Sequence, residues 1–382
     1  MGTTAETRIC CMGTSHHPML AVNETRFPAG YDPIRDELLS FQRQALLGVS
    51  RTFALTIPQL PEPLRTVIGN AYLLCRIADT VEDEPTLTSE EKARFLGRFV
   101  DVVAGRTSAT DFAAELHPLL SDATSAAERD LVRKTSSVVS LTRSLRHRQQ
   151  NAIQRCIRIM AAGTADFSNG SARGLTTVRE LDRYCYHVAG VVGETITELL
   201  CEYSGEIAER GYYLRAQAAD FGRALQLVNI IKDLWEDRAR GVCWLPRDAF
   251  PRVDLSTDGK WTGHDFEAGI LKLVDRARGC LEHAFEYTLL IPPRETGVRR
   301  FLLWTLGLAV LTLRRIHAQP GFPTGDTVKI SRRQVRGVVF ATSTLARWNG
   351  ALRWLFRLSM RPMGASTSAA SPGIVYAVKS GG

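Results

Sequence analysis

The residues Gln226-Leu-Val-Asn-Ile-Ile-Lys-Asp-Leu-Trp-Glu-Asp237 are the most informative stretch of this chain. At about 100° per residue, the amide and carboxylate side chains share one narrow helical stripe, and aliphatic side chains cover the rest. The stripe consists of Gln226, Asn229, Asp233, Glu236 and Asp237. Carboxylates within one turn repel one another unless a cation lies between them, and only Lys232 and Arg238 are nearby. Oxygen donors without His or Cys favour Mg²⁺, so the stretch predicts a magnesium-binding helix.

The pattern Asp-x-x-Glu-Asp occurs a second time at residues 79–83, where it ends another apolar helical run. One copy alone is more often a solvated helix end, but two copies that each close an apolar helix favour a shared site. Two facing carboxylate clusters suit several Mg²⁺ ions that bridge a diphosphate, which predicts an enzyme that ionises or transfers a phosphorylated substrate. The expected metal ligands are Asp79, Glu82, Asp83, Asp233, Glu236 and Asp237.

The composition is that of an ordinary soluble protein with an excess of basic residues. Of its 382 residues, 45% are hydrophobic and 23% are charged, which is enough for a large core. The net charge of +8 favours an anionic partner such as a diphosphate, a lipid surface or a nucleic acid. Because the Lys and Arg residues are scattered and form no block that alternates with aromatics, we expect no nucleic-acid partner.

The cysteines and the N-terminus indicate the compartment. The eight cysteines include no Cys-x-x-Cys pair, and the chain opens without a secretory hydrophobic segment. We therefore expect reduced thiols and a cytoplasmic protein. The eight histidines are too dispersed to build a zinc site.

Periodicity divides the chain into one helical domain and two tails. Residues 1–32 have no helical repeat and residues 362–382 are small and polar, so a disordered N-terminal tail and a flexible C-terminal tail are predicted. Residues 33–361 carry helical patterns with no alternating β-branched runs, which predicts a single all-α domain. The Gly- and Ser-rich segment 168–174 does not spell Gly-x-Gly-x-x-Gly, so a Rossmann phosphate loop is not supported.

Residues 301–313 form a run of thirteen uncharged residues between two Arg-Arg pairs. As a helix, this run is about 20 Å long, which is short of the ~30 Å hydrocarbon core of a membrane. We therefore expect a buried central helix rather than a transmembrane anchor. Since it is apolar on every side, it could also line a hydrocarbon-binding cavity.

Residues 346–361 read as a basic amphipathic helix. Its arginines, Arg347, Arg353, Arg357 and Arg361, gather on one arc. The opposite arc holds Trp348, Leu352, Leu355 and Phe356. Such a helix can lie on an anionic membrane surface, which predicts a peripheral location on the inner face of a membrane. The alternative is a terminal helix packed on the body of the protein, with its arginines reaching to solvent.

Residues 41–345 resemble the squalene/phytoene synthase family. The resemblance rests on the two acidic motifs, Arg76–Asp83 and Gln226–Asp237, and on four further segments. These are Ser50-Arg-Thr-Phe-Ala54, Gly163-Thr-Ala-Asp-Phe167, Tyr184-Cys-Tyr-His-Val-Ala-Gly190 and Val328-Lys-Ile330. The resemblance implies an isoprenoid synthase helical bundle around a central apolar cavity, with the acidic motifs on facing helices.

The resemblance also implies a reaction. It is the Mg²⁺-dependent head-to-head condensation of two farnesyl diphosphate molecules to presqualene diphosphate, followed by reduction to squalene with NADPH. The implied catalytic residues are Tyr184, Arg76, Phe53 and Phe301. The implied substrate-binding residues are Ser50, Arg51, Gln226 and Asn229. The implied NADPH-binding residues are Arg51, Arg76, Lys232 and Lys329. Tyr184 is expected to help remove a proton, and the two phenylalanines to stabilise a carbocation.

Several alternatives stay open at this point. Relatives that make phytoene, dehydrosqualene or hydroxysqualene need no NADPH, and the basic position that should follow Lys329 is Ser331 here, with Arg332 displaced by one. A non-catalytic helical protein that binds a membrane surface or nucleic acid is a different class of alternative. Tyr184 could be a core tyrosine, and Arg76 could simply pair with Asp79 one turn away. The oligomeric state is left open.

Overall fold

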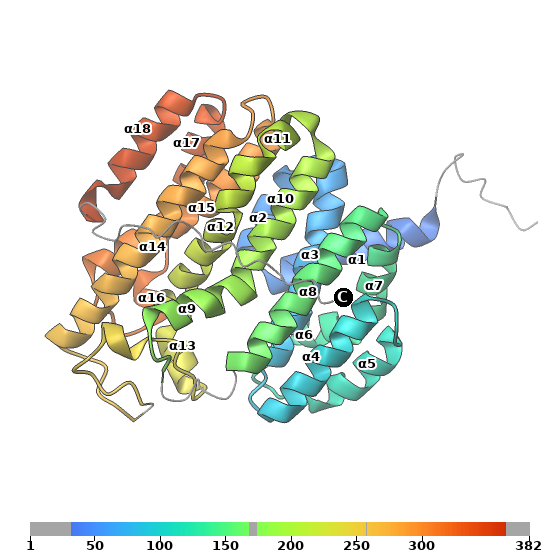
Figure 1. The fold of residues 1–382 in the computed structure, drawn as a ribbon, viewed down its shortest axis with the longest axis horizontal. Helices are drawn as coiled ribbons and strands as arrows, with labels where there is room; N and C mark the ends of the chain where they lie inside the picture. The colour runs from blue at the N-terminus through green and yellow to red at the C-terminus, as the bar shows by residue number, and fades with distance from the viewer. Residues whose placement is uncertain (1–31, 168–173, 257, 364–382) are drawn as a thin grey trace, which may run out of the picture.

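The computed structural model describes residues 32–167, 174–256 and 258–363, and every regular element in these ranges is a helix (Figure 1). A single isolated bridge joins Leu175 and Pro246. The predicted all-α class is therefore confirmed. The segment 168–173 and most of both predicted tails lie outside the described residues.

The first half of the chain supplies the right-hand side of the molecule in Figure 1. Its α-helices are α1 (Pro33–Val49), α2 (Arg51–Thr56), α3 (Glu62–Asp83), α4 (Ser89–Val103), α5 (Ala109–Leu116), α6 (Ala126–Arg133), α7 (Thr135–Arg143) and α8 (His147–Phe167). Asp32, which the sequence analysis placed in the disordered tail, caps α1 instead, because its side chain accepts hydrogen bonds from the backbone of Ile34 and Arg35.

The second half supplies the helices in the centre and on the left of Figure 1. They are α9 (Val178–Cys185), α10 (Val191–Tyr203), α11 (Gly205–Glu209), α12 (Gly211–Lys232), α13 (Leu234–Ala239), α14 (His264–Leu290), α15 (Thr296–Ala318), α16 (Gly325–Val328), α17 (Arg332–Leu345) and α18 (Asn349–Met360). One turn of π-helix, Tyr186–Gly190, joins α9 to α10.

Helix α12 lies in the centre of the fold, between α10 and α14 (Figure 1). Two glycines permit the close approach of its neighbours. A Cβ atom at Gly222 would lie 1.9 Å from the carbonyl oxygen of Ala189 in the π-helical turn, and one at Gly193 would lie 2.1 Å from that of Ala218. Any larger residue would force these helices apart, so the two glycines set the distance between α12 and the segment that carries Tyr184.

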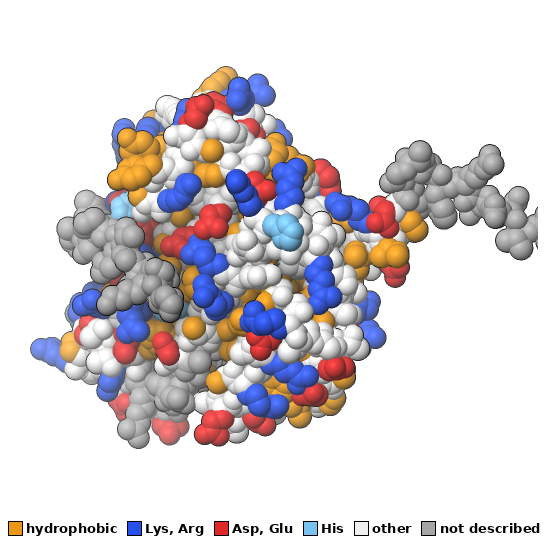
Figure 2. All heavy atoms as spheres, turned by 45° about the vertical axis from the view of Figure 1, so that its right-hand side comes forward, with side chains coloured by type: hydrophobic (Ala, Val, Ile, Leu, Met, Phe, Trp, Pro, Cys, Tyr) orange, Lys and Arg blue, Asp and Glu red, His pale blue; other side chains and the backbone are white. Residues whose placement is uncertain are grey.

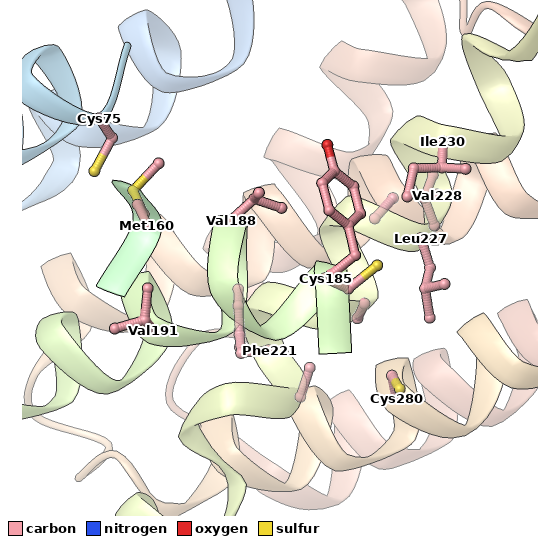
Figure 3. Close-up of a cluster of buried hydrophobic side chains, with 14 of the residues drawn as sticks. Cys75, Met160, Cys185, Val188, Val191, Phe221, Leu227, Val228, Ile230 and Cys280 are labelled. Atoms are coloured by element: carbon pink, nitrogen blue, oxygen red, sulfur yellow. The ribbon is translucent and has the colours of Figure 1, made fainter. Parts of the chain in front are cut away.

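The core around α12 is built from side chains of several helices. Figure 3 shows Cys185, Val188 and Val191 in the same buried cluster as Phe221 and three other labelled residues of α12. All of these side chains belong to one continuous hydrophobic cluster. Because interiors of this kind are close-packed, the segment after α9 is held firmly against α12.

Helix α15 contains the apolar run 301–313. Among the described residues, it is the one helix long and apolar enough to cross a membrane, and 67% of its most apolar window is buried inside the protein. Phe301 and Leu313 are both buried, and the helix packs against α2, α12, α14 and α17. The expected buried central helix is confirmed.

The C-terminal helix corrects one expectation from the sequence. Arg353 does not share the outer arc with the other arginines, because it turns inward and pairs with Glu286 of α14 (Nη2 to Oε2, 2.8 Å). Phe356 does pack inward, where it stacks on Phe285 with ring centroids 4.1 Å apart. Trp348, expected on the same apolar arc as Phe356, does not pack with it and is exposed. It precedes the first residue of α18, where the chain is extended and no longer follows the helical repeat.

We expect Gly222→Ala to destabilise the protein by about 1–3 kcal/mol, because the added methyl group collides with backbone that cannot move freely. Thermal unfolding measures the effect. Gly97→Ala is the matched control: no atom lies within 4 Å of a Cβ at this exposed position in α4, so the exchange should stabilise by about 0.5–1 kcal/mol. An unchanged midpoint for Gly222→Ala would contradict the close approach of α12 to the π-helical turn.

Candidate active site

The first acidic motif, residues 79–83, forms the end of α3, which stops at Asp83. Glu84 also belongs to this run of acidic residues, but its side chain stabilises the fold. Its carboxylate accepts hydrogen bonds from the backbone N–H of Ser121 (3.0 Å) and the hydroxyl of Thr124 (2.7 Å). These bonds hold the pKa of Glu84 down at about 2 despite its burial. The carboxylates left for a site are those of residues 79, 82 and 83.

The sequence predicted one continuous helix for the second acidic motif. In the structure this prediction is wrong, because the motif is divided between two helices. Helix α12 ends at Lys232, Asp233 is its C-cap with φ −97° and ψ 10°, and α13 begins at Leu234. The Asp233 carboxylate lies 3.0 Å from the Lys232 ammonium group. The backbone N–H of Asp237 still donates to the carbonyl of Asp233 (2.9 Å), so Asp237 remains one turn further on.

Arg240 joins the two motifs. Its Nη1 lies 2.9 Å from Oδ1 of Asp83 at the end of α3, and its Nη2 lies 2.5 Å from Oδ1 of Asp237 in α13. The facing arrangement of the two clusters, which the sequence predicted, is thus present in the structure. Arg240 is thus a further cation beside the second motif, where only Lys232 and Arg238 were predicted to be nearby.

The carboxylates repel one another and are partly shielded from water. Burial raises the pKa of Asp79 to about 7, and the nearby charge of Asp83 adds to the rise. Burial raises the pKa of Glu82 to about 8, with repulsion from Asp83 and Asp79 adding to it. Burial also raises the pKa of Asp237 to about 6, although Arg240 opposes the shift. The cluster therefore has a deficit of positive charge.

This donor set fits Mg²⁺ in its chemistry. All donors are carboxylate oxygens, and the mutual repulsion that raises their pKa values is what a divalent cation relieves. In the described residues no three acidic, His or Cys groups enclose a metal position, and the guanidinium group of Arg240 pairs with both Asp83 and Asp237. Metal binding by all six carboxylates remains a prediction.

Tyr184 is tied directly to the first motif. Its hydroxyl group donates to Oε1 of Glu82 (3.1 Å), while Oε2 of the same carboxylate accepts from the hydroxyl of Thr164 (3.2 Å). The Tyr184 ring stacks on Trp244, with centroids 3.9 Å apart and an interplanar angle of 12°. Burial raises the pKa of Tyr184 well above its usual value. Tyr184 is buried, but its hydroxyl group bonds to a candidate metal ligand rather than to the backbone.

Three of these neighbours were assigned no role from the sequence. Thr164 stands in the segment 163–167 that carries the resemblance, so it could have been suspected. Arg240 follows Asp237 by three residues, a spacing at which helical ion pairs form. Trp244 gave no signal, because its stacking on Tyr184 depends on the path of the chain after α13.

Arg76 has two partners. Its Nη1 lies 3.9 Å from Oδ2 of Asp79, as the spacing in the helix predicts. Its closer partner is Glu128 of α6, which bonds to Nη2. The pair therefore links α3 to α6, and Arg76 remains only partly exposed beside the acidic motif.

The aromatic and hydroxyl residues of the predicted site are only partly brought together. Phe53 packs on Tyr72 of α3, with ring centroids 4.8 Å apart, and Ser50 caps α2 by accepting from the backbone N–H of Phe53 (3.0 Å). Phe301 is buried within α15, and among the described residues no ring contact joins it to Tyr184 or Phe53. Its predicted contact with a carbocation thus has no support from the neighbouring rings.

Gln226 and Asn229 lie on α12, about two turns and one turn before Asp233 respectively. Gln226 is half-buried and Asn229 is exposed. Neither side chain forms a hydrogen bond with the described residues, so both amides are free to meet a ligand.

Arg51 and Lys329 lie near the second motif. Both side chains are exposed, Arg51 at the start of α2 and Lys329 at the end of α16. A hydrogen bond to Asp326 raises the pKa of Lys329, attraction to Glu236 adds to the rise, and the charge of Arg51 opposes it. The two basic residues are therefore close enough to influence each other, although they are far apart in the sequence.

The helical fold and the acidic groups at adjoining helix ends define the class: an all-α isoprenoid synthase fold. A solved structure of TcSQS in complex with a ligand has the same fold, with a TM-score of 0.65, 25% sequence identity, and coverage of 88% of this chain and 93% of that one. The sequence profile of the family described as squalene/phytoene synthase matches residues 46–334. The chain belongs to the squalene/phytoene synthase family, as its sequence motifs indicated.

Curated relatives of this chain include fungal proteins. The squalene synthase of Eremothecium gossypii is 29% identical over 280 residues, which is 71% of this chain and 60% of that protein. A squalene synthase of Gibberella zeae is 27% identical over 321 residues, covering 80% of this chain and 66% of that protein. This chain thus spans 60–66% of the length of these two relatives.

We expect Arg240→Gln to strengthen the binding of Mg²⁺ or Mn²⁺ about tenfold, because the arginine and the metal compete for the carboxylates of Asp83 and Asp237. Calorimetric titration with the metal alone measures this. The thermal midpoint without metal should fall, and its rise on adding metal should grow.

Arg106→Gln is the matched control, since Arg106 pairs only with the exposed Asp101. It should leave the affinity for the metal unchanged. Weaker metal binding by Arg240→Gln would show that Arg240 supports the metal-bound arrangement rather than competing with it.

Proposed function

We propose that this protein is a squalene synthase: it condenses two farnesyl diphosphates to presqualene diphosphate with Mg²⁺ and reduces this intermediate to squalene with NADPH. The observation that supports the proposal most strongly is the meeting of two Asp-x-x-Glu-Asp motifs through Arg240. Acidic residues gathered at one place require a cation and, through it, suit an anionic substrate. The names of the curated relatives point to the same activity.

The residues that would hold Mg²⁺ are Asp79, Glu82, Asp83, Asp233, Glu236 and Asp237. Bound Mg²⁺ would neutralise the diphosphate so that it can leave. Lys232 and Arg76, which lie beside the two motifs, would add positive charge where the diphosphate binds. Gln226 and Asn229, whose amides have no hydrogen-bond partner among the described residues, would contact the substrate from α12.

Tyr184 and its neighbours would act on the hydrocarbon part of the reaction. The stacked rings of Tyr184 and Trp244 present an aromatic surface beside Glu82, and such a surface stabilises a nearby carbocation. The hydroxyl group of Tyr184 donates a hydrogen bond to Glu82, so the tyrosine oxygen would accept a proton from the substrate while its own proton passes to the Glu82 carboxylate. We include Phe53, which packs near the acidic end of α3, and the buried Phe301 only as further apolar lining of the proposed hydrocarbon cavity.

Arg51 and Lys329 would receive the phosphate groups of NADPH. Both are exposed cations that lie near each other, and the fold has no Rossmann loop among its described residues to do this task. We place the enzyme in the cytoplasm, with residues 346–361 against an anionic membrane, because substrate and product carry long hydrocarbon chains. Nucleic acid has no part in the proposal.

One assay tests the proposal. The protein is incubated with farnesyl diphosphate and Mg²⁺, with and without NADPH, and the products are identified by mass. Squalene with NADPH and presqualene diphosphate without it are expected. Dehydrosqualene, hydroxysqualene or phytoene-type products in saturating NADPH would identify a relative that does not use the nicotinamide. No turnover of any prenyl diphosphate would contradict an enzymatic function.

We expect Tyr184→Phe to lower the rate of presqualene diphosphate formation about 10²-fold if the hydroxyl group takes part in proton removal. If only the ring matters, Tyr184→Phe should retain activity while Tyr184→Ala loses it. Rates with farnesyl diphosphate measure this. Tyr287→Phe is the control, because it removes a buried hydroxyl group that bonds only to Thr197. Equal rates for all Tyr184 variants would assign Tyr184 to the core.

We expect Lys329→Ala to raise the NADPH concentration needed for half-maximal squalene formation about tenfold to a hundredfold, since one charge-assisted phosphate contact contributes about 1.5–3 kcal/mol. Formation of presqualene diphosphate should stay nearly unchanged. Lys260→Ala, at another exposed lysine, serves as the control. An unaltered NADPH requirement in Lys329→Ala would place the cofactor elsewhere.

A further inference from the structure

The outer face of the last two helices carries large apolar side chains that are exposed among the described residues. Phe340 of α17 is 75% exposed, Trp348 between the helices is 64% exposed, and Trp354 of α18 is 65% exposed. Leu358, one turn after Trp354, is also exposed. Within the described residues these side chains have no hydrogen bond or ring contact. Figure 1 shows α18 at the edge of the molecule, outside α14 and α15.

The same face is exclusively basic. Its exposed arginines are Arg332, Arg333, Arg336, Arg347, Arg357 and Arg361. From Thr327 to Gly382 the chain contains no Asp or Glu at all. On the face drawn in Figure 2, by contrast, basic and acidic side chains lie side by side. The basic surplus of the protein is therefore concentrated at the end of the chain that carries these exposed aromatic side chains.

The inner faces of these helices hold the surface rigidly in place. Arg299 of α15 donates to the side chain of Asn349 (2.5 Å), and Trp304 donates to Ser343 (3.1 Å). A Cβ atom at Gly307 would lie 2.6 Å from Val338, so α17 packs tightly on α15. The exposed aromatics are thus not the consequence of a loosely attached helix, because the side of each helix that packs on the protein is already filled.

We propose that α17 and α18 together form a docking surface for an anionic lipid membrane, with Phe340, Trp348 and Trp354 inserted among the headgroups and the arginines bound to lipid phosphates. The proposed surface extends the membrane contact expected for residues 346–361 to a second helix, α17. It does not include Arg353, which pairs with Glu286. It adds to the proposed function a defined membrane surface, but its test does not depend on catalysis.

The combination of residues favours lipid over other partners. Trp residues beside Arg residues are typical of the membrane interface, where the ring lies at headgroup depth and the cation meets phosphate. A second copy of the chain would bring the six arginines of one face against those of another, without a carboxylate on either side. Nucleic acid would use the arginines but would leave the exposed Leu358 in water.

Sedimentation of the full chain with lipid vesicles tests this surface. We expect binding to vesicles that contain equal parts of phosphatidylglycerol and phosphatidylcholine, little binding to phosphatidylcholine alone, and weakening by salt. Trp348→Ser with Trp354→Ser should lower the partition coefficient at least tenfold. Arg336→Gln with Arg357→Gln should lower it about tenfold on anionic vesicles only.

Matched controls use equally exposed residues elsewhere. Tyr212→Ser with Tyr213→Ser removes two aromatics that are 81% and 61% exposed, and Arg35→Gln with Arg43→Gln removes two exposed arginines of α1. Neither control should change the binding to vesicles. The proposal is overturned if the wild-type protein does not bind anionic vesicles, or if the controls weaken binding as much as the variants do. It is also overturned if the protein prefers single-stranded RNA, or if the tryptophan variants dissociate a dimer in vesicle-free solution.

Discussion

Repulsion between carboxylates at two helix ends is the constraint around which this structure is arranged. Asp83 and Asp237 would drive α3 and α13 apart if Arg240 did not lie between them. The same excess of negative charge explains why Glu82 is held by two hydroxyl donors and why the pKa values of its neighbours are raised. Such a cluster reduces stability, and it is kept where its charge is used.

Close packing makes that arrangement possible. Helix α12 approaches the π-helical turn and α10 at Gly222 and Gly193, where no side chain fits. The core shown in Figure 3 then fixes the direction of α9 relative to this contact. The hydroxyl group of Tyr184 therefore reaches Glu82 because backbone contacts several residues away hold the same segment in place. Precise placement of a polar pair depends here on apolar packing.

Much of the fold and the acidic centre could be predicted from local patterns. Helical periodicity gave the class, the length of the apolar run gave the burial of α15, and the repeated spacing of acidic residues gave the two motifs. Features that depend on tertiary contacts could not be predicted in this way. Glu128 pairs with Arg76, which lies 52 residues away in the sequence. Trp244 stacks on Tyr184 only because of the path that the chain takes after α13. The inward turn of Arg353 likewise required knowledge of Glu286 on α14.

The π-helical turn at Tyr186–Gly190 divides one long helix into α9 and α10, which differ in their rotation about the helix axis. Before it, α9 is oriented by the bond from Tyr184 to Glu82; after it, α10 is oriented by the contact of Gly193 with α12. A regular α-helix would fix the rotation of α10 relative to α9. Deleting one residue from the turn would change that rotation by about 100°, so that either the hydroxyl group or the glycine contact could be kept, but not both. The wider turn is therefore the structural solution that lets the side chain of Tyr184 and a packing surface share one helix.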